Sequence, residues 1–381
     1  MSDLDKLKQL TCQMHLEPAE DSGSPPLSPA SQEVITVKAA QLPNGKRIRL
    51  LKTLLSSYCE KNCRYCPMRS HRDHPRAAFS PGDFARLFHS LHRAGFVEGI
   101  FLSSSIDQGV VTTQDNLLAT ARLLRDRYHF QGYLHLKIMP GAEKDQVQEA
   151  MLIADRLSVN LEAPHPQALM HLAPEKNFKR ELLQPLRWIE EIRATQSPHQ
   201  AWKNSWPSST TQFVVGAAGE TDLDILAATD HLRRTTHISR AYYSSFSPIQ
   251  DTPLENAPPS PPQRELRLYQ AFYLLEEYDF SLEDLPYQES GYLPLETDPK
   301  LAWAEKHLLQ QRPLEINTAP REELLRVPGL GPRSVTAILA ARRVRTLTSL
   351  SQLKRLGIHT QRTKPYILMN GRTPAHQLRL F

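Results

Sequence analysis

Three cysteines within eight residues are the feature of this sequence that most directly indicates chemistry. Cys59, Cys63 and Cys66 follow the pattern Cys-x3-Cys-x2-Cys in the segment YCEKNCRYCPMR. Because they are odd in number and closely spaced, they do not suit a disulfide framework and instead predict reduced thiolates that bind a metal group. Three thiolates can ligate three irons of a four-iron four-sulfur cubane and leave the fourth iron open. Cys12 stands alone near the N-terminus and is assigned no role.

Zinc is the alternative metal for these thiolates. A zinc site usually has a fourth Cys or His ligand, and His71 and His74 lie close enough in the sequence to be considered. Their spacing is not that of a zinc ribbon, so we favour the iron–sulfur cluster. Basic residues around the loop could guide a phosphate backbone, form a solvated face or balance nearby acids. These residues are Lys61, Arg64, Arg69, Arg72 and Arg76.

The chain around the cysteines alternates between short apolar strands and helices, which predicts an α/β fold. Ser80 and Thr221 begin two of the helices with capping-box patterns. Six strand–helix units in a row imply a parallel sheet with right-handed crossovers, either an open barrel or a doubly wound sheet. The strands are predicted at 47–57, 99–104, 133–139, 156–162, 212–216 and 239–245, and the helices at 81–94, 113–128, 144–153, 181–194, 221–234 and 263–278.

The composition is that of a globular protein without a membrane segment. Hydrophobic residues make up 40% of the sequence and charged residues 23%. No apolar run approaches the roughly 20 residues that span a bilayer, and the N-terminal MSDLDKLKQL lacks the features of a signal peptide. We therefore expect a soluble, cytoplasmic protein with no membrane partner. The 30 prolines mark connections, including a linker at 19–33 and long loops at 197–209 and 251–263.

Charge is distributed unevenly along the chain. The 381 residues exceed what one hydrophobic core usually supports, so two domains are expected. Residues 312–381 contain 13 Lys and Arg against three acids, a formal charge of +10, whereas residues 1–311 carry −5. A basic terminal module on a mildly acidic body predicts a polyanion partner, although a positive face can also serve solubility.

The basic module contains a glycine hairpin between two predicted helices, in residues 315–343, EINTAPREELLRVPGLGPRSVTAILAARR. Gly329 and Gly331, on either side of Leu330, permit a tight turn. The helix that follows would present free backbone N–H groups, which form a phosphate cradle. The pattern resembles a helix-hairpin-helix DNA-binding motif, in which Arg333 and Ser334 are placed to assist phosphate binding.

A degraded copy of this pattern follows, with the turn Leu356-Gly357-Ile358. Ser349 and Gln352 form a capping-box pattern at its start. His359 replaces the second glycine, so we expect this copy to pack as a structural mate. A purely structural helical module is the alternative for the pair; the hairpin and the charge favour nucleic acid.

The cysteine loop resembles the radical S-adenosylmethionine (radical SAM) superfamily, in which an aromatic residue precedes the last cysteine. Tyr65 occupies that position. The resemblance implies a partial (β/α)6 barrel, a 4Fe-4S cluster and S-adenosyl-L-methionine as cofactors, and an external electron donor such as flavodoxin or ferredoxin. In that family an electron from the cluster breaks the sulfonium bond to give a 5'-deoxyadenosyl radical, while the protein orients the reactants.

The same resemblance suggests cofactor contacts at the ends of later strands, because barrel enzymes build their sites at that face. The chain departs from the family at the second strand, where two serines stand in place of Gly-Gly-Glu. Ordinary polar residues at strand ends, or glycines that only make a turn, are the alternative. The candidates are Tyr65, Ser103, Ser104, Lys137, Asn160, Glu162, Gly216 and Glu220.

Nearly the whole chain resembles a bacterial family of radical SAM proteins described as DNA modification or repair proteins. The segments that carry the resemblance include EGIFLSSSI, VNLEAP, VVGAAGETD and RVPGLG. It implies an N-terminal extension (1–40), a catalytic domain (41–296) and a helix-hairpin-helix domain (312–381), with hydrogen abstraction from a nucleotide of DNA. RNA, a small-molecule or protein substrate, and a non-catalytic iron–sulfur DNA sensor are the alternatives.

Overall fold

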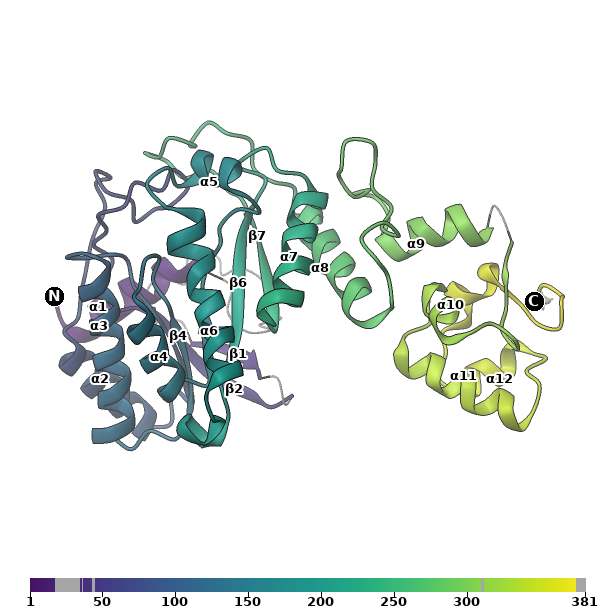
Figure 1. Ribbon diagram of the computed structural model, residues 1–381, viewed down its shortest axis with the longest axis horizontal. Coiled ribbons are helices and arrows are strands. Elements are labelled where there is room, and N and C mark those ends of the chain that lie inside the picture. The colour runs from purple at the N-terminus through teal and green to yellow at the C-terminus, as the bar shows by residue number, and fades with distance from the viewer. Residues whose placement is uncertain (18–34, 36, 43–44, 310–311, 375–381) are drawn as a thin grey trace. The chain divides into compact units, whose positions relative to one another are not determined.

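The computed structural model describes residues 1–17, 35, 37–42, 45–309 and 312–374 (Figure 1). The chain forms two compact units, the first from Met1–Glu220 and Ala228–Ser260, the second from Thr221–Ala227 and Pro261–Phe381. The linker expected at 19–33 lies outside the described residues. The sequence analysis ends the catalytic domain at residue 296 and begins the helix-hairpin-helix domain at residue 312, and this division into functional domains stays a prediction.

The first unit is built on a curled half-barrel sheet, which is one of the two arrangements that the alternating pattern allows and the one that the family resemblance implies. Its seven strands pair in the order in which they occur in the chain. The first strand is antiparallel to the second, and the following six are parallel. The strands are β1 (Val37–Gln41), β2 (Arg47–Leu54), β3 (Gly99–Ser103), β4 (Tyr133–Lys137), β5 (Arg156–Ser158), β6 (Ser208–Val215) and β7 (Arg240–Ser245).

Helices α2 (Pro81–Arg93), α3 (Val110–Arg122), α4 (Lys144–Ile153) and α6 (Gln184–Thr195) each follow a parallel strand and pack beside one another on the sheet (Figure 1). Ser80 caps the second helix, where its hydroxyl accepts a hydrogen bond from Asp83 N at 3.2 Å. Thr221 and Asp224 form the other expected capping box. Further helices are α1 (Asp3–Cys12), α5 (Pro166–Leu172) and α7 (Asp222–Thr236), with π-helical turns at Leu123–Arg127 and Phe178–Leu183.

The fifth strand is shorter than its sequence pattern suggests. The apolar alternation predicts a strand over 156–162, but the ladder of β5 ends at Ser158. Glu162 has a φ of 65°, a left-handed conformation that interrupts an extended strand. The chain then rejoins the sheet through an isolated bridge between Glu162 and Phe213. This irregular strand end turns Asn160 and Glu162 toward the mouth of the half-barrel.

The second unit is mainly helical and contains the glycine hairpin. Its core includes Leu324, Val335, Ile338 and Leu353, each fully buried. Gln352 accepts a hydrogen bond from Ser349 N at 3.0 Å, as the capping-box pattern predicts. The elements are α8 (Pro262–Glu277), α9 (Pro299–Ala304), η7 (Glu305–Leu309), β8 (Leu314–Glu315), α10 (Arg321–Arg326), α11 (Pro332–Val344), α12 (Leu350–Arg355), α13 (Thr360–Thr363), η8 (Lys364–Tyr366) and β9 (Ile367–Leu368).

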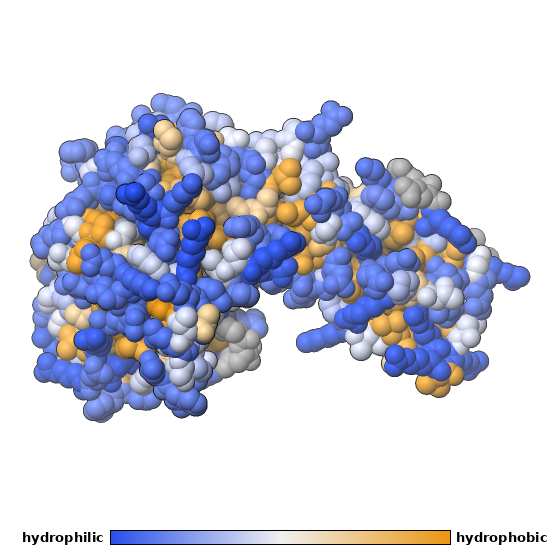
Figure 2. Space-filling model, in the orientation of Figure 1, coloured by the Kyte–Doolittle hydropathy of each residue, from blue (hydrophilic) through white to orange (hydrophobic). Residues whose placement is uncertain are grey.

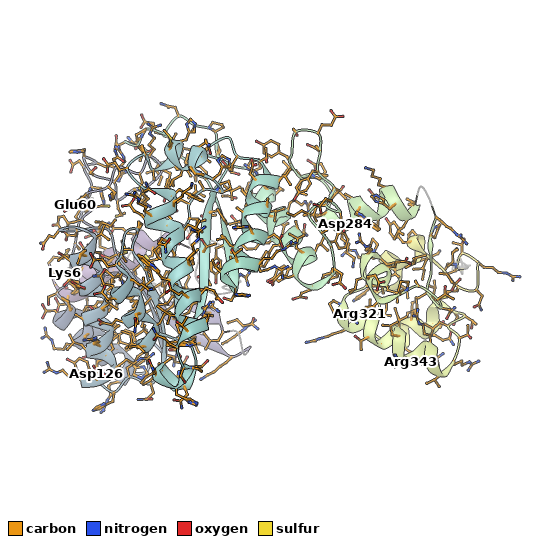
Figure 3. The ribbon with its side chains drawn as sticks, in the orientation of Figure 1. Lys6, Glu60, Asp126, Asp284, Arg321 and Arg343 are labelled. Carbon is orange, nitrogen blue, oxygen red and sulfur yellow. The ribbon has the colours of Figure 1, made fainter. Side chains whose placement is uncertain are left out.

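Hydrophilic side chains cover most of the visible face of both units (Figure 2). Within the described part of the chain, no helix combines the length and apolar character needed to cross a bilayer. Basic side chains such as Arg321 and Arg343 extend outward from the second unit (Figure 3).

Candidate active site

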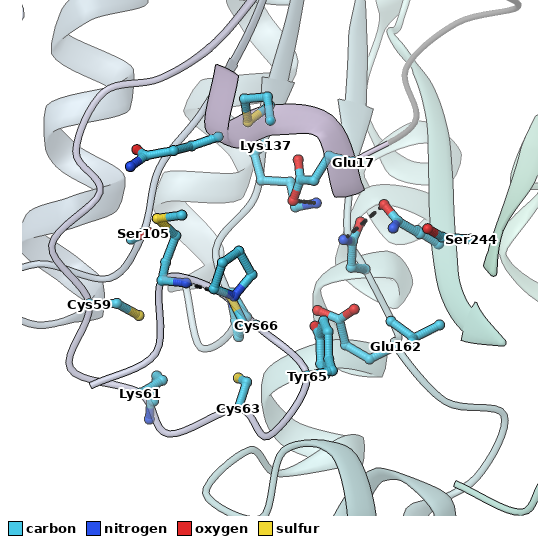
Figure 4. A pocket seen from close by; sticks show the side chains of 18 of the residues that line it. Glu17, Cys59, Lys61, Cys63, Tyr65, Cys66, Ser105, Lys137, Glu162 and Ser244 are labelled. Atoms are coloured by element: carbon cyan, nitrogen blue, oxygen red, sulfur yellow. Dashed lines mark hydrogen bonds and ion pairs between the residues drawn. The ribbon is translucent and has the colours of Figure 1, made fainter. Parts of the chain in front are cut away.

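A cavity of about 1050 Å³, counted with the space at its open mouth, lies at the carboxyl ends of the half-barrel strands. The loop after β2 supplies Cys59, Cys63 and Cys66, and Tyr65 lies between the last two. Figure 4 shows these side chains around the same space as Lys137 and Glu162. The cavity therefore brings together the cysteines and the polar ends of the following strands, as expected for a barrel site.

Arg76 stabilises the conformation of the cysteine loop through hydrogen bonds to backbone carbonyls. Its guanidinium donates to the carbonyls of Ser57 at 2.7 Å, Arg69 at 2.8 Å and Met68 at 3.2 Å. Arg72 similarly donates to Gln250 O at 2.9 Å and Pro67 O at 3.2 Å. Two of the five basic residues around the loop therefore bind its own backbone, which is a structural role.

Burial makes the cysteine thiolates costly unless positive charge lies nearby. Desolvation raises the pKa of Cys63 and of Cys66, and mutual repulsion with neighbouring thiolates adds to the rise. Lys176 acts in the opposite direction on both thiols. Thiolates in such surroundings need a metal group or a cation to stay deprotonated.

Glu162 and Lys176 form a buried ion pair beside these thiols. Lys176 Nζ lies 3.0 Å from Glu162 Oε1. Burial, together with repulsion from the Glu162 carboxylate, raises the pKa of Tyr65 well above its usual value. The second carboxylate oxygen, Glu162 Oε2, is buried and has no hydrogen-bond partner among the described residues. Such an oxygen is free to accept a hydrogen bond from a ligand.

Residues distant in the sequence complete the cavity. Asn160 Nδ2 donates to Gln212 Oε1 at 3.2 Å, and both side chains line the space. Lys137 Nζ lies 3.0 Å from Glu17 Oε1, which the N-terminal segment supplies. The pattern of the sequence contains no signal for Glu17, Lys176 or Gln212, since none belongs to a recognised motif.

Three of the cofactor candidates lie elsewhere. Ser103 is buried inside β3, and Ser104 lines the cavity in its place. The Glu220 carboxylate accepts hydrogen bonds from the backbone N–H groups of Gly216 and Ala218, so this segment forms a closed turn. Neither Gly216 nor Glu220 is among the described residues that line the cavity, and their cofactor role stays a prediction.

The donor set of the cavity fits an iron–sulfur cluster. Three sulfurs reach one space, and an unsatisfied carboxylate oxygen lies beside them. Within the described ranges, no group of three His, Cys, Asp or Glu is close enough to hold a single metal ion. A cubane separates its ligands more widely than one ion does, because each thiolate binds a different iron.

No family model and no curated protein sequence matches this chain. Among solved structures, the [FeFe]-hydrogenase maturase HydG matches with 13% identity and a TM-score of 0.45, over 59% of this chain and 49% of its own. Methylornithine synthase (PylB) matches with 14% identity and a TM-score of 0.47, over 61% of this chain and 63% of its own. TsrM of Kitasatospora setae is a radical S-adenosylmethionine methyltransferase with cobalamin and a [4Fe-4S] cluster bound. It matches with 13% identity and a TM-score of 0.42, over 66% of this chain and 41% of its own.

This chain therefore spans between two fifths and two thirds of the length of these neighbours.

The glycine hairpin of the second unit lies between α10 and α11. Gly329 has a φ of +84°, and Gly331 is the N-cap residue of α11. The first backbone bond of that helix runs from Val335 N to Gly331 O at 2.9 Å, so the N–H groups of Arg333 and Ser334 precede it. The hairpin thus lies between two helices, and its identity as a helix-hairpin-helix module stays a prediction.

The second copy of the pattern supports the first hairpin. Thr363 Oγ1, in the second copy, donates to Pro328 O at 3.1 Å. On the other side, Lys300 Nζ donates to Leu330 O. Gly357 has a φ of +78° and makes the corresponding turn. The hairpin is thus held by side chains from two neighbouring segments.

Proposed function

We propose that this chain is a radical SAM enzyme that binds a [4Fe-4S] cluster through Cys59, Cys63 and Cys66 and acts on nucleic acid. The observation that carries the proposal is that the three thiols line one cavity with polar residues at or near the ends of the five strands β3 to β7. The cysteine spacing and the position of Tyr65 add to it. When bound, the cluster and S-adenosylmethionine supply the reductive cleavage that begins radical chemistry.

The residues of the chain have the following roles in this proposal. The loop fixed by Arg76 presents the three thiolates, and Lys176 offsets part of their negative charge. Glu162 Oε2 and the Ser104 hydroxyl are acceptors for polar groups of the cofactor. Apolar residues such as Met139 help the cavity to exclude water from a reactive intermediate.

The second unit supports a nucleic acid as the substrate. Its hairpin orients free N–H groups at the start of α11, and residues 312–381 carry a formal charge of +10. Backbone amides and positive charge recognise phosphates without reading bases. We assign DNA as the substrate because the hairpin resembles a DNA-binding motif. RNA is the second candidate, because phosphate binding by backbone amides does not distinguish the two nucleic acids by the 2'-hydroxyl.

The test is anaerobic incubation of the reconstituted, reduced protein with S-adenosylmethionine and deuterated DNA. Mass analysis of 5'-deoxyadenosine should show deuterium transferred from DNA. Transfer from deuterated RNA alone would correct the substrate to RNA. Absence of any cofactor cleavage by a protein with full cluster content would instead favour a non-catalytic sensor. Cleavage without transfer from either nucleic acid would favour another substrate.

A further inference from the structure

Two lysines place positive charge in the interior of the half-barrel. Lys52 on β2 and Lys137 on β4 are 3% and 5% exposed. Lys52 pairs in register with Phe101 on β3, which pairs with His135 on β4. His135 and Lys137 are two residues apart, so their side chains share a face of the sheet. The side chains of both lysines therefore lie on the same face of the sheet, and Lys137 lies two residues further along β4 than the residue aligned with Lys52.

The negative charge that acts on both lysines comes from outside the barrel strands. Glu17 lies directly after the short helix η1 (Gln13–Leu16), 120 residues before Lys137 in the chain. Its Oε1 lies 3.0 Å from Lys137 Nζ, and its Oε2 is buried without a hydrogen-bond partner among the described residues. Figure 4 shows the Glu17 carboxylate beside Lys137, above the cysteine loop.

Among the described residues, the charges at this place do not balance. Burial lowers the pKa of Lys52 to about 7, with repulsion from Lys38 and Lys137 adding to the effect and Glu17 opposing it. Attraction from Lys137, with further help from Lys52 and His135, lowers the pKa of Glu17 despite its burial. One carboxylate thus compensates two buried ammonium groups only in part, and uncompensated buried charge is unfavourable.

The ion pair lies in the wall of the candidate active site. Glu17 and Lys137 both line the cavity that the three cysteines line, together with Gln13 and Met14 of the same N-terminal segment. A ligand that enters this cavity therefore meets Lys137 with a carboxylate of the chain already bound to it. A dianionic oxyanion would compensate the two lysines better than the single charge of Glu17 does.

We propose that Lys137, supported by Lys52, is an oxyanion site of the cavity, and that Glu17 occupies it until a phosphate group of the substrate displaces it. The inference rests on the proposed function only in assigning the anion to the substrate. The N-terminal segment is then a built-in competitor, and substrate binding includes the release of Glu17 from Lys137. The alternative is that Glu17 and Lys137 form a permanent ion pair that only stabilises the fold.

The test measures binding of inorganic phosphate and of acetate to the full-length, cluster-loaded chain by calorimetry. Glu17→Gln keeps the size of the side chain and removes its charge. It should bind phosphate at least about tenfold more tightly than wild type, because the internal competitor is gone. Phosphate should bind more tightly than acetate, because acetate carries only the same single charge as Glu17, and tighter binding of acetate would contradict the proposal. Asp126→Asn makes the same charge change at an exposed position and should leave affinity unchanged.

Adding Lys137→Met to Glu17→Gln should abolish the tighter binding. Equal affinity in wild type and Glu17→Gln, or tight binding that survives Lys137→Met, would overturn the proposal. If Glu17→Gln does not fold, hydrogen exchange of residues 3–16 in the wild-type chain decides. Saturating phosphate should speed that exchange, and unchanged exchange would show that Glu17 is not displaced. Because these readouts need no turnover, failure of the radical chemistry would not affect them.

Discussion

Lys176 Nζ lies 3.0 Å from Glu162 Oε1, in a pair whose side chains are only 8% and 5% exposed. The pair couples the end of the half-barrel to the cysteine loop electrostatically, since Glu162 raises the pKa of Tyr65 and Lys176 lowers that of Cys63 against the effect of burial. Removing one partner of such a pair leaves a buried charge without compensation.

Lys176→Met should therefore lower the free energy of unfolding by about 3–5 kcal/mol. The double variant Lys176→Met/Glu162→Gln should recover part of this loss, because the buried carboxylate is then neutral. Urea unfolding at matched cluster content measures the difference. Lys144→Met is the control, because its pair with Glu191 is exposed and should be worth less than about 1 kcal/mol. A loss no greater than that of the control would show that the pair has little structural importance.

Cysteine substitutions should separate the cluster ligands from the remaining thiol. Cys59→Ala, Cys63→Ala and Cys66→Ala should each reduce iron and sulfide content after anaerobic reconstitution, because each removes one thiolate ligand. Cys12 is exposed on α1 and is absent from the described cavity lining, so Cys12→Ala should retain the cluster. Full cluster content in Cys63→Ala, or its loss in Cys12→Ala, would contradict the assignment.

Most of the parallel strands could be predicted because they contain buried apolar runs, which local sequence reveals. The strand β6 begins at Ser208, four residues before its predicted start at 212, because its first half is buried but polar. The half-buried strand β1 was missed, since VKAAQ has no strong alternation or apolar run. The end of β5 was placed too late because a left-handed Glu162 cannot be read from residue type. These errors arise where the tertiary structure decides the backbone conformation.

The cysteines could be found in the sequence because their spacing is itself the signal. Lys176, Gln212 and Glu17 could not, since they reach the cavity only through the fold. Lys176 lies between α5 and α6, and Glu17 contacts Lys137 across 120 residues. Charge complementarity over such distances becomes visible only once the strands are placed.

Stability should rise with pH because of Lys52. Its pKa is lowered to about 7 by burial, against an ordinary value of 10.5. Between these two values the unfolded chain binds more protons than the folded chain, so the free energy of unfolding increases as pH rises from about 7 toward 10. Lys52→Met should remove this part of the slope, whereas the exposed Lys179→Met should not. Urea unfolding across this pH range measures both, and identical slopes in wild type and Lys52→Met would contradict the prediction.

The last prediction concerns the two hairpin glycines, which the structure distinguishes. Gly329 has a φ of +84°, and a methyl group there would lie 2.7 Å from Thr363 Oγ1. Gly331 has an extended backbone, and its methyl group would lie 3.3 Å from Tyr278 Oη. Gly329→Ala should therefore cost about 1–3 kcal/mol of local strain and displace the amides, whereas Gly331→Ala should be milder.

Binding of random-sequence duplex and single-stranded DNA across a salt series tests this consequence. Gly329→Ala should weaken binding more than Gly331→Ala at every salt concentration. Arg333 is exposed, so Arg333→Ala should remove one electrostatic contact and flatten the salt slope by less than about one unit. Wild-type affinity in a folded Gly329→Ala protein, or strong base-sequence preference, would refute the phosphate cradle. Gly329→Ala displaces the backbone amides but leaves the basic side chains. Binding that survives this change would therefore place the nucleic-acid site among the basic side chains.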